Sequence, residues 1–271
     1  MILGLDEKYT RLNYSLQLLL GALGMVIYVI LGKRYELSQL AEFFKTVAYI
    51  SVVQVIVDYG FDLGNLRDVS ISKAKKIKLL ISTSAVKIVC GGVIIFVSFV
   101  LSYFTDLTFH PVLLVTGALL STFNLSWFFF LTKNSFVFSI FSLIFKTFSL
   151  IILLLFTGDD FNINVVLLLL YAPVVLPGMF VIFYYFYRNN EPFDLTSLGG
   201  DFFISLKGNA YIFLNNLVAA TISISWPLTL SWFLIPELVS VYGFIDKLNK
   251  GLLLVFRPLP FFLLTSSKSV K

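Results

Sequence analysis

The sequence has little of what most catalytic and metal sites require. It contains one cysteine, Cys90, and one histidine, His110. A single cysteine excludes an internal disulfide, and a single histidine excludes a metal site built from a histidine cluster. The phosphate-binding loop G-x-x-x-x-G-K-[ST] and the motifs C-x-x-C, H-E-x-x-H and G-x-S-x-G are also absent. We therefore expect a protein that is not an enzyme and that uses no cofactor or metal.

Charged residues are scarce as well. They make up 13% of the chain, against 58% hydrophobic residues, and the mean hydropathy is +0.93. An ordinary soluble domain is roughly a quarter charged, so a chain of this size cannot bury all its apolar surface in a water-soluble core. The net charge of +5 is then better interpreted through the placement of loops than as a nucleic-acid footprint. Membrane lipids are expected partners, and nucleic acid is not.

Long apolar runs predict an all-α polytopic membrane protein with about eight transmembrane helices. A helix needs roughly 20 apolar residues to cross a bilayer core of about 30 Å. The runs do not alternate apolar and polar residues as the strands of a membrane barrel would. The expected spans are 13–31, 37–57, 79–103, 112–131, 136–156, 165–187, 210–234 and 238–264.

Basic residues are unevenly placed between these spans. The segment from Asp58 to Lys78, DYGFDLGNLRDVSISKAKKIK, carries five of the 20 Lys and Arg residues. With a cytoplasmic amino terminus, the inner segments hold twelve basic residues and the outer segments hold only Lys33 and Arg34. The positive-inside rule therefore predicts that both termini are cytoplasmic. The inner residues are Lys8, Arg11, the five of the quoted segment, Lys133, Arg188, Lys207, Lys268 and Lys271.

A faint internal repeat suggests how the spans are grouped. The segments ELSQLAEFFKTVAYIS (36–51) and PELVSVYGFIDKLNK (236–250) both follow a long span and a short outer turn, at an offset of about 198 residues. Parallel six-helix repeats are a transporter architecture. We expect a first six-helix bundle over residues 1–190, a cytoplasmic linker over 191–209, and the first two helices of an incomplete second bundle over 210–271.

Several charged residues lie well inside the expected spans, where charge costs roughly 2.5–3.5 kcal/mol on insertion scales. Six of these seven residues are basic, which favours a cavity for an anionic substrate such as a pyrophosphate; the alternative is snorkelling or internal ion pairing. The candidate substrate-binding residues are Lys45, Lys87, Lys146, Lys250 and Arg257, and the other two are Asp246 and Lys247. Polar Asn124, Asn215 and Asn216 line the same cavity or bridge helices.

The end of the second span resembles a motif of Wzx-type O-antigen flippases. In that family the second helix closes in an Asp-Phe-Gly-Phe-Asn-Leu-like turn followed by Thr-Arg. The corresponding motif residues here are Asp58, Gly60 and Phe61, with Arg67 after a small gap. The segment NLSWFFFLTK is similar to the family's fourth helix and keeps its Trp127, but Phe-Leu-Thr-Lys replaces the Gln-Gly-x-Glu-like turn. Gly60 and Gly64 would let the chain turn sharply at the end of the second helix.

The resemblance extends from about Leu12 to Leu264, where LIPELVSVYGFIDKLNK is similar to the family's eighth helix. Its members have about twelve helices in two bundles and share a superfamily with multidrug exporters. This implies that the chain is truncated at its carboxyl end. It also implies that the protein moves undecaprenyl-pyrophosphate-linked oligosaccharide between the leaflets of a bacterial cytoplasmic (inner) membrane by alternating access. A polysaccharide polymerase and a chain-length regulator are the protein partners that this function implies.

Three other functions remain open from the sequence. A drug or small-solute exporter of the same superfamily would carry cations, which a largely basic cavity disfavours. A membrane polysaccharide polymerase or acyltransferase would need a large outer loop bearing His, Asp or Arg, and the outer loops here are short. A non-functional truncated product is the third alternative, because only one of two bundles is complete.

Overall fold

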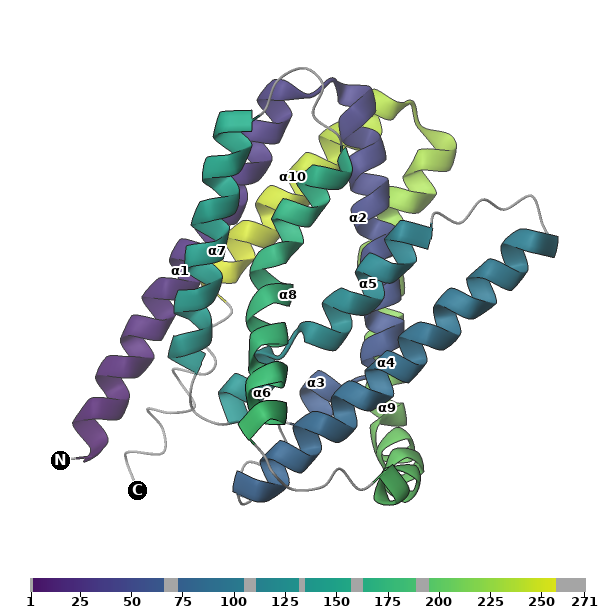
Figure 1. The fold of residues 1–271 in the computed structure, drawn as a ribbon. Coiled ribbons are helices and arrows are strands. Elements are labelled where there is room, and N and C mark those ends of the chain that lie inside the picture. The colour runs from purple at the N-terminus through teal and green to yellow at the C-terminus, as the bar shows by residue number, and fades with distance from the viewer. Residues whose placement is uncertain are drawn as a thin grey trace. The chain divides into compact units, whose positions relative to one another are not determined.

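The structure is a computed structural model of the chain and describes residues 2–65, 73–104, 111–131, 135–156, 163–188 and 195–256. All regular structure in these residues is helical (Figure 1). The helices in chain order are α1 (Ile2–Arg34), α2 (Leu37–Asp58), α3 (Phe61–Gly64), α4 (Lys73–Phe104), α5 (Pro111–Phe123), α6 (Ser126–Leu131), α7 (Ser135–Phe156), α8 (Ile163–Arg188), α9 (Leu195–Phe233) and α10 (Pro236–Phe256).

Five of these helices contain a segment long and apolar enough to cross a membrane. The segments are Ser15–Arg34, Leu37–Asp58, Leu79–Val97, Phe136–Leu155 and Asn164–Tyr184. They match the first, second, third, fifth and sixth expected spans. Lipid offers the backbone no hydrogen-bond partners, so a chain this apolar satisfies its N–H and C=O groups within helices. The prediction of an all-α polytopic membrane protein is confirmed.

The other three expected spans differ from the structure in detail. The fourth, 112–131, is broken between α5 and α6, because Asn124 and Leu125 are not helical. The seventh, 210–234, lies inside α9, which starts at Leu195, so much of the expected linker over 191–209 is helical. The eighth, 238–264, contains most of α10, and its last residues lie outside the described part of the chain.

The chain folds into two compact units that interleave along the sequence. The first unit consists of Met1–Phe44, Ser135–Pro173 and Leu234–Lys271, and the second of Lys45–Asn134 and Val174–Phe233. Both α2 and α8 therefore begin in the first unit and end in the second. The expected division into 1–190, 191–209 and 210–271 rests on the sequence repeat and stays a prediction.

In the first unit, α7 and α10 both pack against α1 (Figure 1). The contact with α7 is partly polar: the Ser139 hydroxyl lies 2.7 Å from the Asn13 side-chain oxygen, and Arg34 donates to the Leu153 carbonyl at 3.4 Å. The contact with α10 is apolar, with Phe244 against Gly32 and Gly251 against Met25. Two helices from distant parts of the sequence thus pack against the same helix, α1.

In the second unit, α4 packs along α5 and also contacts α6 and α9. The short helix α3 contacts α9 and α6. Val53 and Val57 of α2 form a small buried cluster with Ala118 of α5 and Ile94 and Ile95 of α4. Helix packing of this kind depends on close apolar contact, since lipid tails are as apolar as the side chains. The cluster holds the carboxyl end of α2 near the middle of α4 and the end of α5.

Candidate functional site

A sharp turn ends α2 and begins α3. Tyr59 and Gly60 both have positive backbone φ angles, 48° and 77°, and this left-handed geometry stops the helix after Asp58. Glycine adopts it freely, whereas a non-glycine residue there costs of order 1–3 kcal/mol. The Tyr59 ring stacks on Phe213 of α9 with ring centroids 4.4 Å apart, which helps to hold the strained residue in place. The expected turn is found at Gly60, whereas Gly64 lies in α3 without a positive φ angle.

The same turn is pressed against α9. A Cβ on Gly60 would lie 2.9 Å from the Ile212 side chain and 3.0 Å from the Phe213 backbone nitrogen, and Gly64 faces the Asn209 side chain with no room for a Cβ. Phe61 between them is 1% exposed. The glycines of the motif therefore have two roles: one allows the turn, and both allow α9 to approach.

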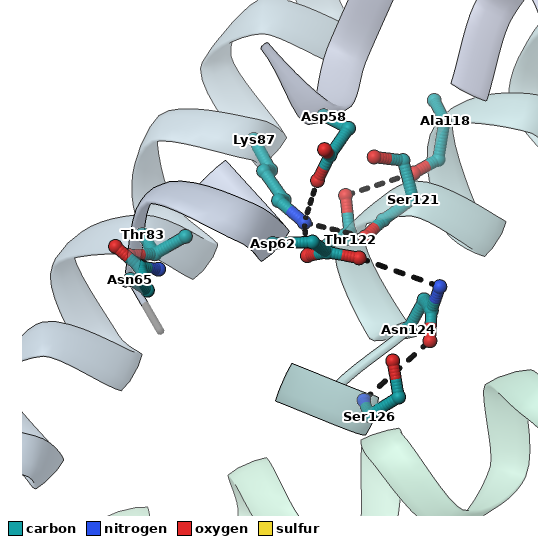
Figure 2. Close-up of polar contacts among 10 residues, drawn as sticks. All are labelled: Asp58, Asp62, Asn65, Thr83, Lys87, Ala118, Ser121, Thr122, Asn124 and Ser126. Carbon is teal, nitrogen blue, oxygen red and sulfur yellow. Dashed lines mark hydrogen bonds and ion pairs between the residues drawn. The ribbon is translucent and has the colours of Figure 1, made fainter. Parts of the chain in front are cut away.

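Lys87 is the centre of an ion-pair site that this turn builds (Figure 2). Its side chain is 1% exposed, and it lies inside the membrane-spanning segment of α4. The ammonium nitrogen is 2.5 Å from Asp58 Oδ1 and 2.7 Å from Asp62 Oδ1, and it donates to the Ser121 carbonyl at 3.2 Å. We call Asp58, Asp62, Lys87 and Ser121 the Lys87 site. The turn matters because it places the end of α2 and the start of α3 around one nitrogen.

The break in the fourth expected span completes the Lys87 site. The Ser121 carbonyl belongs to the last turn of α5, whose carbonyls have no partner within the helix, and a cation at a helix carboxyl end is favourable. Asn124 follows this turn; its side chain donates to Asp62 Oδ2 and accepts from the Ser126 N–H, both at 3.5 Å. Asparagine favours such capping positions over a helix interior, which explains the break.

Burial also affects the chemistry of Asp62, which lies outside the membrane-spanning segments. Loss of water around the carboxyl raises the pKa of Asp62 to about 7, although the Lys87 ammonium acts in the opposite direction. The neighbouring Asp58 carboxylate adds to the rise. Nearby, the Asn65 side chain donates to the Thr83 hydroxyl at 3.0 Å and joins the end of α3 to α4.

A second group of charges lies in the first unit, on α7 and α10. Lys146 of α7 donates to the Leu20 carbonyl of α1 at 2.7 Å. Asp246 of α10 forms an ion pair with Lys250 at 2.7 Å and lies close enough to Tyr28 of α1 to interact with it electrostatically. Leu20 and Tyr28 are eight residues apart on α1, which is about 12 Å along the helix axis. Lys247 lies beside Asp246 and is half-buried. We call Lys146, Asp246, Lys247 and Lys250 the basic group; Asp246 and Lys250 contact each other on α10, whereas Lys146 on α7 contacts α1, the helix against which α10 also packs.

The structure distributes the predicted site residues between these two places. Lys87 belongs to the Lys87 site, Lys146 and Lys250 belong to the basic group, and Lys45 is half-buried on α2. The motif residues Asp58, Gly60 and Phe61 build the turn, and Trp127 is 1% exposed in α6. Arg67 and Arg257 lie outside the described residues. Sequence reasoning did not find that Lys87 is paired with two carboxylates, because a turn separates Asp58 from Asp62 and Lys87 lies 25 residues after Asp62.

Among the described residues, no group of three or more His, Cys, Asp or Glu side chains is arranged to hold a metal ion. Comparisons of the chain with models of known protein families, with curated proteins and with solved structures found no match. Functional inference therefore rests on the residues themselves.

Proposed function

We propose that the protein is a flippase for an anionic lipid-linked oligosaccharide, the undecaprenyl-pyrophosphate-linked repeat unit of a bacterial surface polysaccharide. It would act by alternating access in the cytoplasmic membrane with both termini inside, and supply a polysaccharide polymerase and a chain-length regulator. The resemblance of the DYGF segment to Wzx-type flippases suggests this substrate class. The basic group in the first unit is the structural observation that carries the proposal.

The basic group contains three lysines and one aspartate, so it has an excess of positive charge. Lys250 is paired with Asp246. In the described part of the chain, Lys146 and Lys247 have no carboxylate within ion-pair distance, and Lys146 is held only by a backbone carbonyl. Lys146 lies inside the membrane-spanning segment of α7, where ionisable side chains are expensive and normally serve a function. An ammonium group with no counter-ion is suited to a pyrophosphate, which lysine binds as a point charge.

Lys87 is the predicted substrate-binding residue whose surroundings least favour that role. Two carboxylates surround its ammonium group, and its side chain is 1% exposed. An anionic substrate would have to displace both carboxylates to reach it. We therefore assign direct substrate contact to Lys146 and Lys247 first, and then to Lys250, which is paired with Asp246. Lys45 and Arg257 stay predictions from the sequence.

The test is complementation of a bacterial strain that lacks its own O-antigen flippase. The wild-type chain, shown to reach the membrane, is expected to restore polymeric surface polysaccharide on a gel. Lys146→Met and Lys247→Met together should reduce the polymer at least about tenfold, since each removes a charge from the basic group at little cost to helix packing. Lys207→Met, which changes an exposed lysine of α9, is the matched control and should leave the polymer unchanged.

Two results would contradict the proposal. The first is no polymer from a wild-type chain that is well expressed in the membrane, which would reject the flippase function. The second is full polymer from a variant in which Lys146, Lys247 and Lys250 are all replaced by methionine. That result would keep the function and reject the basic group as its substrate site.

A further inference from the structure

The Lys87 site holds more negative than positive charge. Asp58 and Asp62 face one ammonium group, and no other charged side chain in the described residues contacts them. With both carboxylates ionised the site has a net charge of about −1. A buried net charge is unfavourable, and proteins commonly relieve it by changing the protonation state of one group. The geometry alone therefore favours uptake of one positive charge.

A buried hydroxyl group supports the same conclusion independently. Ser121 is 3% exposed, and its Oγ has no hydrogen-bond partner among the described residues. Figure 2 shows this hydroxyl pointing toward the Asp58 carboxylate, while the carbonyl of the same residue accepts from Lys87. Buried polar groups are normally hydrogen-bonded, so an unpartnered buried hydroxyl that points toward a carboxylate marks a place where a proton or a water is expected.

We propose that Asp58, Asp62, Lys87 and the Ser121 hydroxyl form a reversible proton-binding site, with the proton carried on the Asp62 carboxyl. The carboxylate of Asp62 takes the proton from water and becomes a neutral carboxylic acid. Lys87 remains paired with Asp58, so the loaded site is neutral and the unloaded site has a net charge of about −1. No substrate takes part, and the proposal holds whatever the chain transports.

Access and surroundings fit this assignment. The Asp62 side chain is 26% exposed and the Lys87 side chain 1% exposed, so the carboxyl is the more accessible of the two groups. Among the described residues, the titratable groups that face Asp62 are Asp58 of α2 and Lys87 of α4. The α9 residues pressed on the turn, Asn209, Ile212 and Phe213, do not titrate, and neither does Asn124 before α6. Burial raises the pKa of Asp62 to about 7, so the site loads and unloads near neutral pH.

The test is infrared difference spectroscopy of the purified full chain between about pH 5 and about pH 9, where unperturbed carboxyl groups are already ionised. A protonated carboxylic acid has a C=O stretching band well separated from the carboxylate bands. The wild type is expected to lose one such band with a midpoint near pH 7. Asp62→Asn should abolish the band. Asp246→Asn, which changes the carboxylate of the basic group, is the matched control and should retain it.

Lys87→Met adds a directional test. It removes the positive charge that favours the ionised form, so the midpoint of the band should rise by at least about one pH unit. If Asp62→Asn does not fold, Asp62→Glu is compared instead, and its band must change in frequency or midpoint. The proposal is overturned if the wild type shows no titrating carboxyl band in this range. It is also overturned if the band is unchanged in a folded Asp62 variant.

Discussion

Replacing Lys87 by methionine is the sharpest test of the Lys87 site as a structural element. Lys87→Met keeps the length and apolar stem of the side chain but removes its ammonium group. Asp58 and Asp62 then face each other with no counter-ion, and the Ser121 carbonyl at the end of α5 loses its donor. The variant thus disrupts the contacts that join the ends of α2 and α5 to α4, while it leaves the apolar packing of α4 nearly unchanged.

The expected loss follows from the distances. At an effective dielectric constant of about 20, two opposite charges about 4 Å apart attract by about 4 kcal/mol, and this offsets the cost of burying them. Breaking a buried ion pair by removing one partner costs about 3–5 kcal/mol. The side chains of Asp58 and Asp62 are 20% and 26% exposed, so we expect a penalty at the lower end of this range. We therefore expect the free energy of unfolding to fall by about 3 kcal/mol near pH 8.

The measurement is unfolding in mixed micelles with a denaturing detergent, followed by tryptophan fluorescence. Lys207→Met is the control and should stay within about 0.5 kcal/mol of the wild type, as surface substitutions do. The loss in Lys87→Met should shrink near pH 5, because the uncompensated carboxylates then take up protons. Adding Asp58→Asn and Asp62→Asn to Lys87→Met restores neutrality and should recover most of the stability.

Two results would refute this reasoning. A loss of less than about 1 kcal/mol in Lys87→Met would mean that the ion pairs stabilise the fold no more than exposed ones do. A full loss that the two added asparagines do not reverse would mean that the ammonium group acts through packing and not through its charge.

Two more predictions concern Gly60 in the turn and the carboxyl group of Asp62. Gly60→Ala should destabilise the fold by about 2 kcal/mol, because alanine is strained at φ 77° and meets Ile212. Gly208→Ala in α9, where a Cβ meets nothing, should stabilise it by up to about 1 kcal/mol in the same assay. The second prediction is a pH dependence. The pKa of Asp62 is raised to about 7 in the fold, and the unfolded chain releases this proton near pH 3.9. Between about pH 4 and pH 7 only the folded protein keeps it, so stability should fall as pH rises, by at most about 4 kcal/mol, and level off above pH 7. Asp62→Asn should lack this fall, and a wild type with the same pH profile as Asp62→Asn would contradict the assignment.

The membrane spans could be predicted from the sequence where a long run of residues is apolar throughout. The five segments that cross a membrane by length and composition coincide with expected spans, because roughly 20 apolar residues leave few other structures possible. The break at Asn124 could not be found this way. A single asparagine changes the mean hydropathy of 112–131 very little, and its effect depends on local hydrogen bonds to Ser126 and Asp62.

The site could be predicted only in part, for a related reason. Lys87 is visible in the sequence as a charge inside an apolar run, and the turn at Gly60 is visible as a glycine at a helix end. Their meeting is not visible, because it depends on the rotation of α4 about its axis relative to the end of α2. Val53 and Val57 of α2 pack against α4 and α5 and so help to fix that rotation. Lys87 follows Asp62 by 25 residues, so their pairing depends on such contacts between helices. Of the two interpretations that the sequence left open for Lys87, substrate binding and internal ion pairing, the structure shows the ion pair.

The Lys87 site and the basic group hold opposite excesses of charge, and this separates the two proposals. The Lys87 site has two carboxylates for one ammonium, and the basic group has three ammonium groups for one carboxylate. A proton needs only one carboxylate oxygen, whereas a pyrophosphate needs several cationic donors that are not already paired. Lys146→Met therefore removes a donor for the anion and leaves the carboxyl that titrates near pH 7 in place, and Asp62→Asn does the reverse. Because each variant changes a different unit, failure of the transport prediction leaves the proton-binding site standing, and a missing carboxyl band leaves the basic group as a substrate site.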